Sequence, residues 1–468
     1  MISLTLSGLL LFAIIGHEGW RRTTHQPFGL LSVANIVFAL NFCVPPLFVA
    51  IIGGTDLETN PFGKRLFLFR VMEQMNLDMG AYASATWIVV LAYVVMLIVY
   101  LIVTRANTLQ ISPLSTTGIS TVSIAFVGIV LGAIAIAALL LYAAQFVPME
   151  NRAGWVYRLA LLQDEPTGIA KMVKYGNLVR AGRISVSFGS FQVLVMLGVP
   201  SVIFLSAAAI RLRGTFRWVL SIIAIVVWFA VFVRLYHAAG RMELTIFLVF
   251  IPLAILLSVR SMKARMLGGG ALLLFGMFMG LASHTFFPQP TLAASTMATT
   301  LFGDFGRAIL FLLNEFSFPY VMSANTIQVV PEVVPYRYFI DLPLALLYML
   351  PSFSGVDTWP EMISHIHNKT APLMMPYDLV SFGYYSLGWA GVVVVFAALG
   401  AALAVMDRWL TPGTDWLAIC LRTGWMLFLP FRIMYADPYT SMKTGFGLIV
   451  GTVLVLMMVW VAKRWGRA

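Results

Sequence analysis

The sequence predicts an all-α, polytopic integral membrane protein with about eleven transmembrane helices. Its 468 residues are 60% hydrophobic and only 10% charged, which is more apolar surface than a soluble domain of this length can bury. The apolar runs are roughly 17–25 residues long, the length that an α-helix needs to cross a bilayer. These runs lack the alternating pattern of an outer-membrane barrel. The observations together favour a bundle of spanning helices.

The predicted spans follow one another along the whole chain. They are placed near residues 2–16, 29–53, 80–103, 121–146, 191–210, 218–236, 243–259, 267–283, 390–406, 415–433 and 446–462. The opening "MISLTLSGLLLFAIIG" has no basic n-region and no small-residue cleavage site, so we expect a retained first helix and not a signal peptide. We expect residues 1–468 to form a single domain, because no internal repeat or Gly/Ser linker divides them.

Basic residues predict the orientation of the chain. With the N-terminus outside, the cytoplasmic segments include "HEGWRRTTH", "RLRGTFR", "RSMKAR" and "KRWGRA", and cytoplasmic loops are enriched in Lys and Arg. The C-terminus is then cytoplasmic, and three long loops, 54–79, 147–190 and 284–389, lie outside. The last loop contains "AILFLLNEFSFPYVM" and "DLPLALLYMLPSF". These apolar runs of about 10–14 residues favour interfacial or re-entrant helices.

Arginines gather on the expected outer face, against the general bias for basic residues. The ones singled out are Arg180, Arg183, Arg241, Arg337 and Arg432. A guanidinium group forms paired hydrogen bonds with phosphate oxygens and stays charged at any relevant pH. The pattern favours a site for an anionic lipid headgroup such as a pyrophosphate. The alternative is that long translocated loops tolerate basic residues, some of which contact anionic lipids.

Candidates for proton transfer lie in the largest loop. Asp341 and Asp378 are embedded among apolar residues, and a carboxylate in a desolvated site can remove a proton from a sugar hydroxyl. His365 is a third candidate base. Either acid could instead be the partner of an arginine. His365 and His367 form an H-x-H pair without a third nearby ligand, so we expect no metal site.

Aromatic residues and glycines crowd the stretch "SHIHNKTAPLMMPYDLVSFGYYSLGWAG", residues 364–391. Tyr384 and Tyr385 could stack on sugar rings, although an interfacial aromatic belt explains them equally well. The glycines at 383, 388 and 391 would let a ligand or another helix approach the backbone closely.

Motifs of several function classes are missing from the sequence. It contains no G-x-x-x-x-G-K-[ST], no G-x-G-x-x-G opening a helix, no H-E-x-x-H and no nucleophile elbow. An ATP-driven pump, a nicotinamide enzyme and a membrane metalloprotease are therefore disfavoured. We expect no cofactor and no nucleic-acid partner, because no basic patch interleaved with aromatics faces the cytoplasm.

Several segments, taken with the large outer loop before the last three spans, point to one family. They are "AAGRMELTIFLVF", "NEFSFPYVMSANTI", "YMLPSFSGVDTW" with the 364–391 stretch, and "FRIMYADPY". The chain resembles the bacterial O-antigen polymerases, the Wzy-type oligosaccharide repeat-unit polymerases, including the enterobacterial-common-antigen branch. Met242 and Glu243 depart from the small or amide residues that this resemblance leads us to expect, so it gives Glu243 no role.

The resemblance implies a nucleotide-independent glycosyltransferase of the bacterial inner membrane with a GT-C-like fold. Such enzymes transfer a chain growing on undecaprenyl pyrophosphate onto a new lipid-linked repeat unit at the periplasmic face. Loops 147–190 and 284–389 would form the active-site cavity. Its partners would be the lipid-linked oligosaccharide, membrane lipids and a chain-length regulator. The alternatives are an O-antigen ligase, which shares the architecture, and a lipid-linked oligosaccharide flippase or transporter.

The resemblance also implies roles for individual residues. The pyrophosphate would be bound by Arg180, Arg183, Arg241, Arg337 and Arg432, the acceptor proton taken by Asp341, Asp378 or His365, and the sugars contacted by His367, Tyr384 and Tyr385.

Overall fold

A computed structural model shows a helical membrane protein. It describes residues 2–24, 28–52, 67–106, 113–116, 118–146, 193–237, 241–258, 268, 301–347, 378–410, 415–435 and 438–465. Within these residues all regular structure is helical, and nine helices are long and apolar enough to cross a membrane. The prediction of a polytopic α-helical membrane protein is confirmed at this level.

The helices of the structure agree with most of the predicted spans. Candidate spans in the described part of the chain are Ile2–Thr23, Leu30–Ala50, Met79–Arg105, Thr121–Leu141, Val193–Arg211, Thr215–Leu235, Leu379–Trp409, Trp416–Ile433 and Thr440–Arg464. A shorter apolar helix, Glu243–Ser258, occupies the place of the predicted span 243–259. The predicted span 267–283 lies almost wholly outside the described residues.

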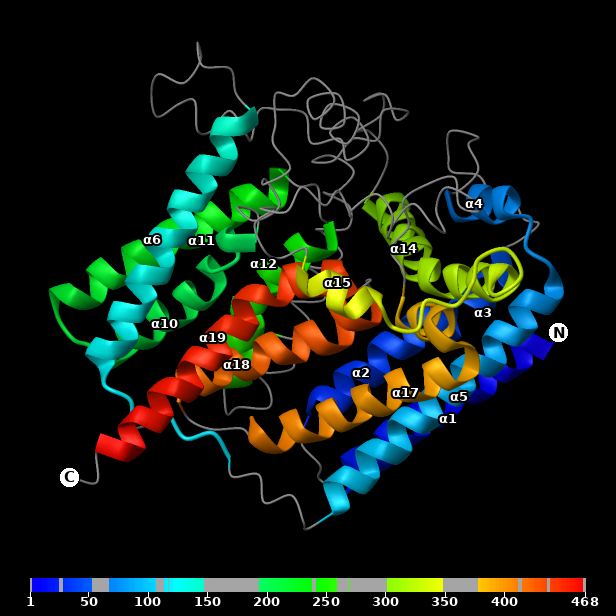
Figure 1. Ribbon diagram of the computed structural model, residues 1–468, viewed down its shortest axis with the longest axis horizontal. Helices are drawn as coiled ribbons and strands as arrows, with labels where there is room; N and C mark the ends of the chain where they lie inside the picture. Colours follow the sequence, from blue (N-terminus) through cyan, green and yellow to red (C-terminus); the bar gives the residue numbers. More distant parts are fainter. Residues whose placement is uncertain are drawn as a thin grey trace.

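Figure 1 shows how the helices are arranged. Their bounds are α1 Ile2–Thr23, α2 Leu30–Phe38, η1 Ala39–Cys43, α3 Val44–Ile52, α4 Phe67–Met75, α5 Met79–Arg105, α6 Thr121–Phe146, α10 Gly198–Arg211, α11 Thr215–His237, α12 Arg241–Ser258, α14 Leu301–Val329, α15 Asp341–Leu347, α17 Leu379–Trp409, α18 Trp416–Leu427, η5 Phe428–Ile433 and α19 Pro438–Trp465. Helices α5 and α17 pack together on one side, and α6, α10 and α11 on the other. Helices α12, α18 and α19 lie between these two groups.

The largest predicted loop contains more helix than its apolar runs indicate. The run "AILFLLNEFSFPYVM" is part of α14, which is 29 residues long and not a short interfacial helix. The first seven residues of the run that begins at Asp341 form α15, Asp341–Leu347, and the rest of that run lies outside the described residues. Polar residues and glycines on both sides of the first run, "FGDFGR" before it and "SANT" after it, hide the continuity of α14 in the sequence, whereas its buried face, including Val321 and Met322, packs inside the bundle.

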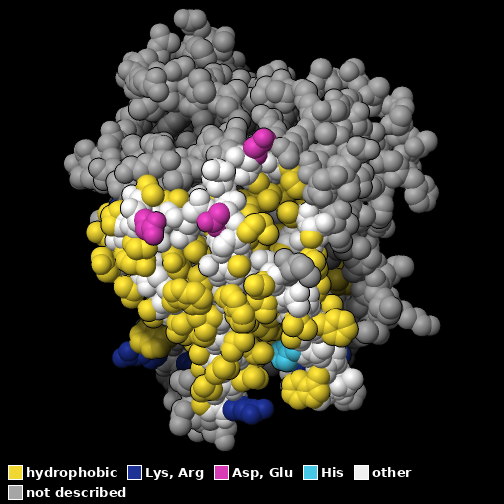
Figure 2. All heavy atoms as spheres, turned by 90° about the vertical axis from the view of Figure 1, so that its right-hand side faces the viewer, with side chains coloured by type: hydrophobic (Ala, Val, Ile, Leu, Met, Phe, Trp, Pro, Cys, Tyr) yellow, Lys and Arg dark blue, Asp and Glu magenta, His cyan; other side chains and the backbone are white. Residues whose placement is uncertain are grey.

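Hydrophobic side chains cover much of the described surface in the view of Figure 2. Large hydrophobic side chains are exposed on several spans, as with Phe12 at 80% and Ile98 at 50%. In Figure 2 the Asp and Glu side chains lie toward the upper part of this face, and the Lys and Arg side chains lie at its lower edge. A bilayer is the solvent in which such a surface is stable. The orientation of the chain across the membrane stays a prediction.

Helix α17 contains a sharp break at the glycines of the 364–391 stretch. Gly388 has φ 59° and ψ −142°, a backbone conformation that favours glycine. The bend brings Gly383 against Gly391, and a Cβ atom on Gly391 would lie 2.0 Å from the carbonyl oxygen of Gly383. In a continuous helix these two residues would be about 12 Å apart along the axis. The glycines therefore allow two segments of one helix to pack against each other.

Candidate anion-binding site

A buried ionic cluster joins three helical elements. Arg234 comes from α11, Glu243 from α12 and Arg432 from η5. The Nη2 of Arg432 donates to Oε1 of Glu243 at 2.7 Å, and the Nη1 of Arg234 donates to Oε2 at 3.4 Å. Exposed fractions of the side chains are 2% for Arg234, 7% for Arg432 and 12% for Glu243. We refer to these three residues as the Arg234–Glu243–Arg432 cluster.

Sequence proximity and helix packing bring the cluster together. Helix α11 ends at His237 and α12 begins at Arg241, so Arg234 and Glu243 are only 9 residues apart in the chain. Helix α12 also packs against α18, which leads into η5. Arg432 lies in a π-helical turn, a feature often found at functional sites, shortly before α19 begins. Its Nε donates to the Oγ1 of Thr444 on α19 at 2.8 Å. The guanidinium group of Arg432 is thus fixed by bonds from two directions.

The cluster carries an excess of positive charge. Two guanidinium groups and one carboxylate leave a formal charge of +1 among three largely buried side chains. Lys443 adds a further electrostatic attraction on Glu243. Buried charges are stable only when they are paired and hydrogen-bonded. The positive charge of Arg234 and Arg432 could therefore balance the charge of a second anion bound in the cluster.

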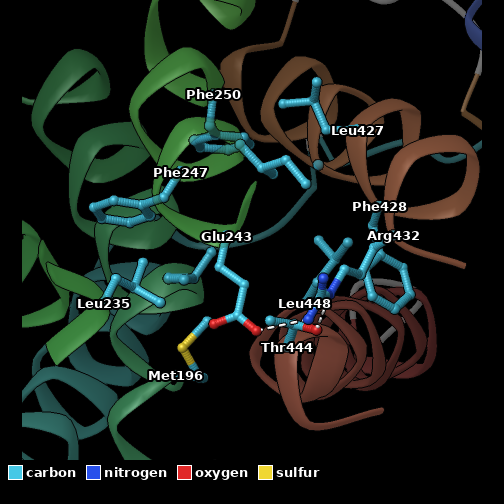
Figure 3. Close-up of a pocket in the computed structure, with 13 residues that line it drawn as sticks. Met196, Leu235, Glu243, Phe247, Phe250, Leu427, Phe428, Arg432, Thr444 and Leu448 are labelled. Carbon is cyan, nitrogen blue, oxygen red and sulfur yellow. Dashed lines mark hydrogen bonds and ion pairs between the residues drawn. The ribbon is translucent and has the colours of Figure 1, made fainter. Parts of the chain in front are cut away.

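An apolar cavity of about 70 Å³ adjoins the cluster (Figure 3). Phe247 and Phe250 on α12 and Phe428 on η5 contribute aromatic rings to its wall. Glu243 and Arg432 point toward each other at the polar edge of this space. The volume corresponds to roughly five water molecules. Charged groups on one side and hydrocarbon on the other match a ligand that is itself amphipathic.

A second ion pair lies near the beginning of α15. The Nη2 of Arg337 donates to Oδ1 of Asp341 at 2.7 Å, and the side chain of Asp341 is 4% exposed. Helix α15 packs against α19, with Ala345 close to Met442. Because α19 also carries Thr444 of the first site, both ion pairs belong to the same end of the bundle.

The segment before α15 is attached to the break in α17. The backbone N–H of Arg337 donates to the carbonyl of Tyr385 at 3.1 Å, and that of Tyr338 donates to the carbonyl of Ser386 at 2.9 Å. The guanidinium carbon of Arg337 lies 6.0 Å from the ring centroid of Tyr385. Tyr384 and Tyr385 are 8% and 4% exposed. The structure therefore brings Arg337 and Tyr385 together and buries both predicted sugar-contacting tyrosines.

Asp378 caps the N-terminus of α17. Its Oδ1 accepts from the backbone N–H groups of Val380 and Ser381 at 2.8 and 2.9 Å, and from the hydroxyl of Ser323 at 3.0 Å. The hydroxyl of Ser381 donates to Oδ2. Asp378 is fully buried, and this burial raises the pKa of its carboxyl to about 6. Helix capping and the two serine hydroxyls, one of them from α14, together satisfy the buried carboxylate.

The other predicted site residues are described in part or not at all. Arg180, Arg183, His365 and His367 lie outside the described residues, and only the backbone of Arg241, the first residue of α12, is described. In the part of the chain that the structure covers, no group of three metal-ligating side chains is found.

Sequence reasoning missed two members of the cluster, Glu243 and Arg234. Glu243 contacts both arginines of the cluster, and the sequence alone assigns it no role. A signal for it was present in the sequence. Glu243 is the carboxylate that follows Arg234 and Arg241 at a turn between two apolar helices, where an isolated acid requires a basic partner.

Comparisons of the chain with protein-family models, curated proteins and solved structures give no match.

Proposed function

We propose that this protein is a membrane-embedded glycosyltransferase that uses an oligosaccharide linked to a polyprenyl pyrophosphate. The observation that carries this proposal is the buried, positively charged Arg234–Glu243–Arg432 cluster beside an apolar cavity. An anionic phosphate group with a hydrocarbon tail is complementary to both parts. The family resemblance of the sequence adds the reaction, which is polymerisation of lipid-linked repeat units at the periplasmic face.

In this reaction the bond between the anomeric carbon of the donor and its pyrophosphate breaks. A bond forms between that carbon and a hydroxyl oxygen of the acceptor sugar, and the lipid pyrophosphate leaves with the electron pair. Arg234 and Arg432 would stabilise the negative charge that develops on the leaving group. The glycosyl–pyrophosphate bond supplies the driving force, so the step requires no nucleotide.

The proton of the acceptor hydroxyl requires a base. Asp341 and Asp378 are the two described candidates. The oxygens of Asp378 already accept four hydrogen bonds, whereas the described residues provide Asp341 with one side-chain donor, Arg337. A carboxylate has about four acceptor positions. We therefore assign the base role to Asp341, with His365 as the alternative.

The experiment that tests this proposal uses the full chain in nanodiscs. Lipid-linked repeat units from the organism that carries the protein are added without nucleotide and in the presence of EDTA, and the products are separated on a gel. We expect a ladder of polymers. If the lipid-linked substrate binds without a ladder, the ligase reaction is the next assay, with lipid A-core as acceptor. If the substrate does not bind, the proposed anion site is wrong.

A matched pair of variants shows whether the cluster carries the activity. Arg432→Gln removes one of the cations that stabilise the leaving group, so we expect the rate to fall by about 10²–10³-fold. Arg211→Gln removes an arginine from an ion pair of the same kind, with Asp415 at 2.8 Å, at the opposite end of α18. We expect this control to keep its activity. Equal loss in both variants would mean that the effect of Arg432 is structural.

A further inference from the structure

We propose that Glu243 is a resident counter-anion, which occupies the position of the ligand's phosphate between Arg234 and Arg432 and is displaced when the ligand binds. This inference rests on the proposed function, because it concerns the same site. It assigns to Glu243 a regulatory role in place of a catalytic one.

The contacts of Glu243 are those of a bound oxyanion. Each of its two oxygens accepts from a different guanidinium group, Oε1 from Arg432 and Oε2 from Arg234. Two oxygens of one phosphate group would bridge the same two donors in the same way. A ligand phosphate cannot occupy this place while the carboxylate does. Binding therefore requires either a different position or the departure of Glu243.

Two features of the structure favour displacement of the Glu243 carboxylate. The contact of Glu243 with Arg234 is long, at 3.4 Å, whereas its contact with Arg432 is 2.7 Å. Glu243 is also the most exposed member of the cluster and lies at the edge of the cavity (Figure 3). Lys443 on α19 adds a further electrostatic attraction on the carboxylate. Glu243 therefore does not depend on the two arginines alone for a counter-charge.

A resident carboxylate has two consequences for the site. It provides the buried guanidinium groups with a counter-charge when no ligand is bound, because buried charges without a partner destabilise the folded protein. It also makes binding a competition between anions, because the ligand must interact with the arginines more strongly than one carboxylate does. We therefore expect the site to prefer a pyrophosphate, with two or more negative charges, to a monoanionic phosphodiester.

The test measures binding of farnesyl pyrophosphate to the full chain in nanodiscs. We expect Glu243→Gln to bind it at least tenfold more tightly than the wild type, because the competing anion is removed. The matched control is Glu18→Gln, which removes the carboxylate of another largely buried ion pair, with Arg21 at 2.8 Å. Glu18 is not among the residues that line the cavity, so we expect this control to bind like the wild type.

The outcomes separate this inference from the proposed function. If the wild type binds and Glu243→Gln binds equally or less tightly, displacement is wrong and the anion site stands. If neither the wild type nor Glu243→Gln binds farnesyl pyrophosphate, both the anion site and the displacement of Glu243 are wrong. A monoanionic farnesyl phosphodiester provides a second comparison. We expect the preference for the pyrophosphate over the phosphodiester to be smaller in Glu243→Gln than in the wild type.

A second readout uses the wild-type protein, because Glu243→Gln leaves two buried guanidinium groups without their counter-charge. Infrared difference spectra are recorded before and after addition of farnesyl pyrophosphate, with the carboxylate band of Glu243 assigned through Glu243→Asp. We expect this band to shift as the carboxylate leaves Arg432. An unchanged band at saturating ligand would overturn the proposal.

Discussion

Replacement of Asp378 by alanine removes the buried acceptor at the beginning of α17. Loss of the helix cap costs about 1 kcal/mol, and each buried donor left without a partner costs about 1–3 kcal/mol more. The Ser323 and Ser381 hydroxyls can turn toward other acceptors, whereas the N–H groups of Val380 and Ser381 cannot. With about 1 kcal/mol for the cap and about 1–3 kcal/mol for each of these two N–H groups, we expect Asp378→Ala to lower the free energy of unfolding by about 3–7 kcal/mol.

The assay is denaturant unfolding of the full chain in detergent micelles, with two comparison variants. Asp78→Ala removes the cap of α5, an exposed aspartate that accepts from the N–H of Ala81, and should cost about 1 kcal/mol. Asp378→Asn keeps a capping oxygen and should cost less than Asp378→Ala. It should also keep glycosyl transfer, because capping needs no charge. If Asp378→Ala is no less stable than Asp78→Ala, the capping argument is wrong.

The dependence of stability on pH tests the same site. Burial raises the pKa of Asp378 from 3.8 to about 6, so the folded protein binds this proton more tightly than the unfolded chain. The contribution of Asp378 to stability is therefore greatest at low pH and decreases as the pH rises from about 4 to about 6, by up to about 3 kcal/mol. The stability of the wild type relative to Asp378→Asn should fall over this interval. A constant difference would contradict the assignment.

Two further predictions concern the close contact between Gly383 and Gly391 and the hydrogen bond of Asp407 at the beginning of α2. Gly391→Ala places a methyl group against the carbonyl oxygen of Gly383 and should lower stability by about 1–3 kcal/mol, whereas Gly8→Ala, which meets nothing within 4 Å, should be neutral in the same unfolding assay. Asp407→Ala removes the acceptor for the N–H of Leu30 at the beginning of α2 and should cost about 1–2 kcal/mol. If Gly391→Ala or Asp407→Ala is as stable as the wild type, the contact assigned to that residue does not stabilise the protein.

Long apolar runs made the spanning helices predictable, because the length of a run and its hydrophobicity are local properties. Helix α17 shows where this reasoning fails. Its predicted span begins at residue 390, whereas the helix begins at Leu379 and continues through the break at Gly388. Polar and aromatic residues before the break resemble a loop in the sequence. In the structure these residues form the first turns of α17, and Gly383 packs against Gly391 across the break.

The sequence indicated that Arg337 and Arg432 need an anionic partner, but it did not show which residues supply that partner in the folded chain. Arg432 and Arg337 were expected to bind an anion, and the structure gives each of them a carboxylate partner. The partner of Arg337 is four residues away in the chain, at a helical spacing that sequence can indicate. The partner of Arg432 is Glu243, 189 residues away, which only the packing of α12 against α18 brings close.

A cryo-electron microscopy structure of the full chain in nanodiscs with undecaprenyl pyrophosphate would show directly whether the anion replaces Glu243. We expect the pyrophosphate within hydrogen-bond distance of Arg234 and Arg432, the carboxylate of Glu243 displaced from between them, and the first part of the hydrocarbon tail in the adjoining cavity. A pyrophosphate bound elsewhere, with the contacts between Glu243 and both arginines unchanged, would contradict this expectation.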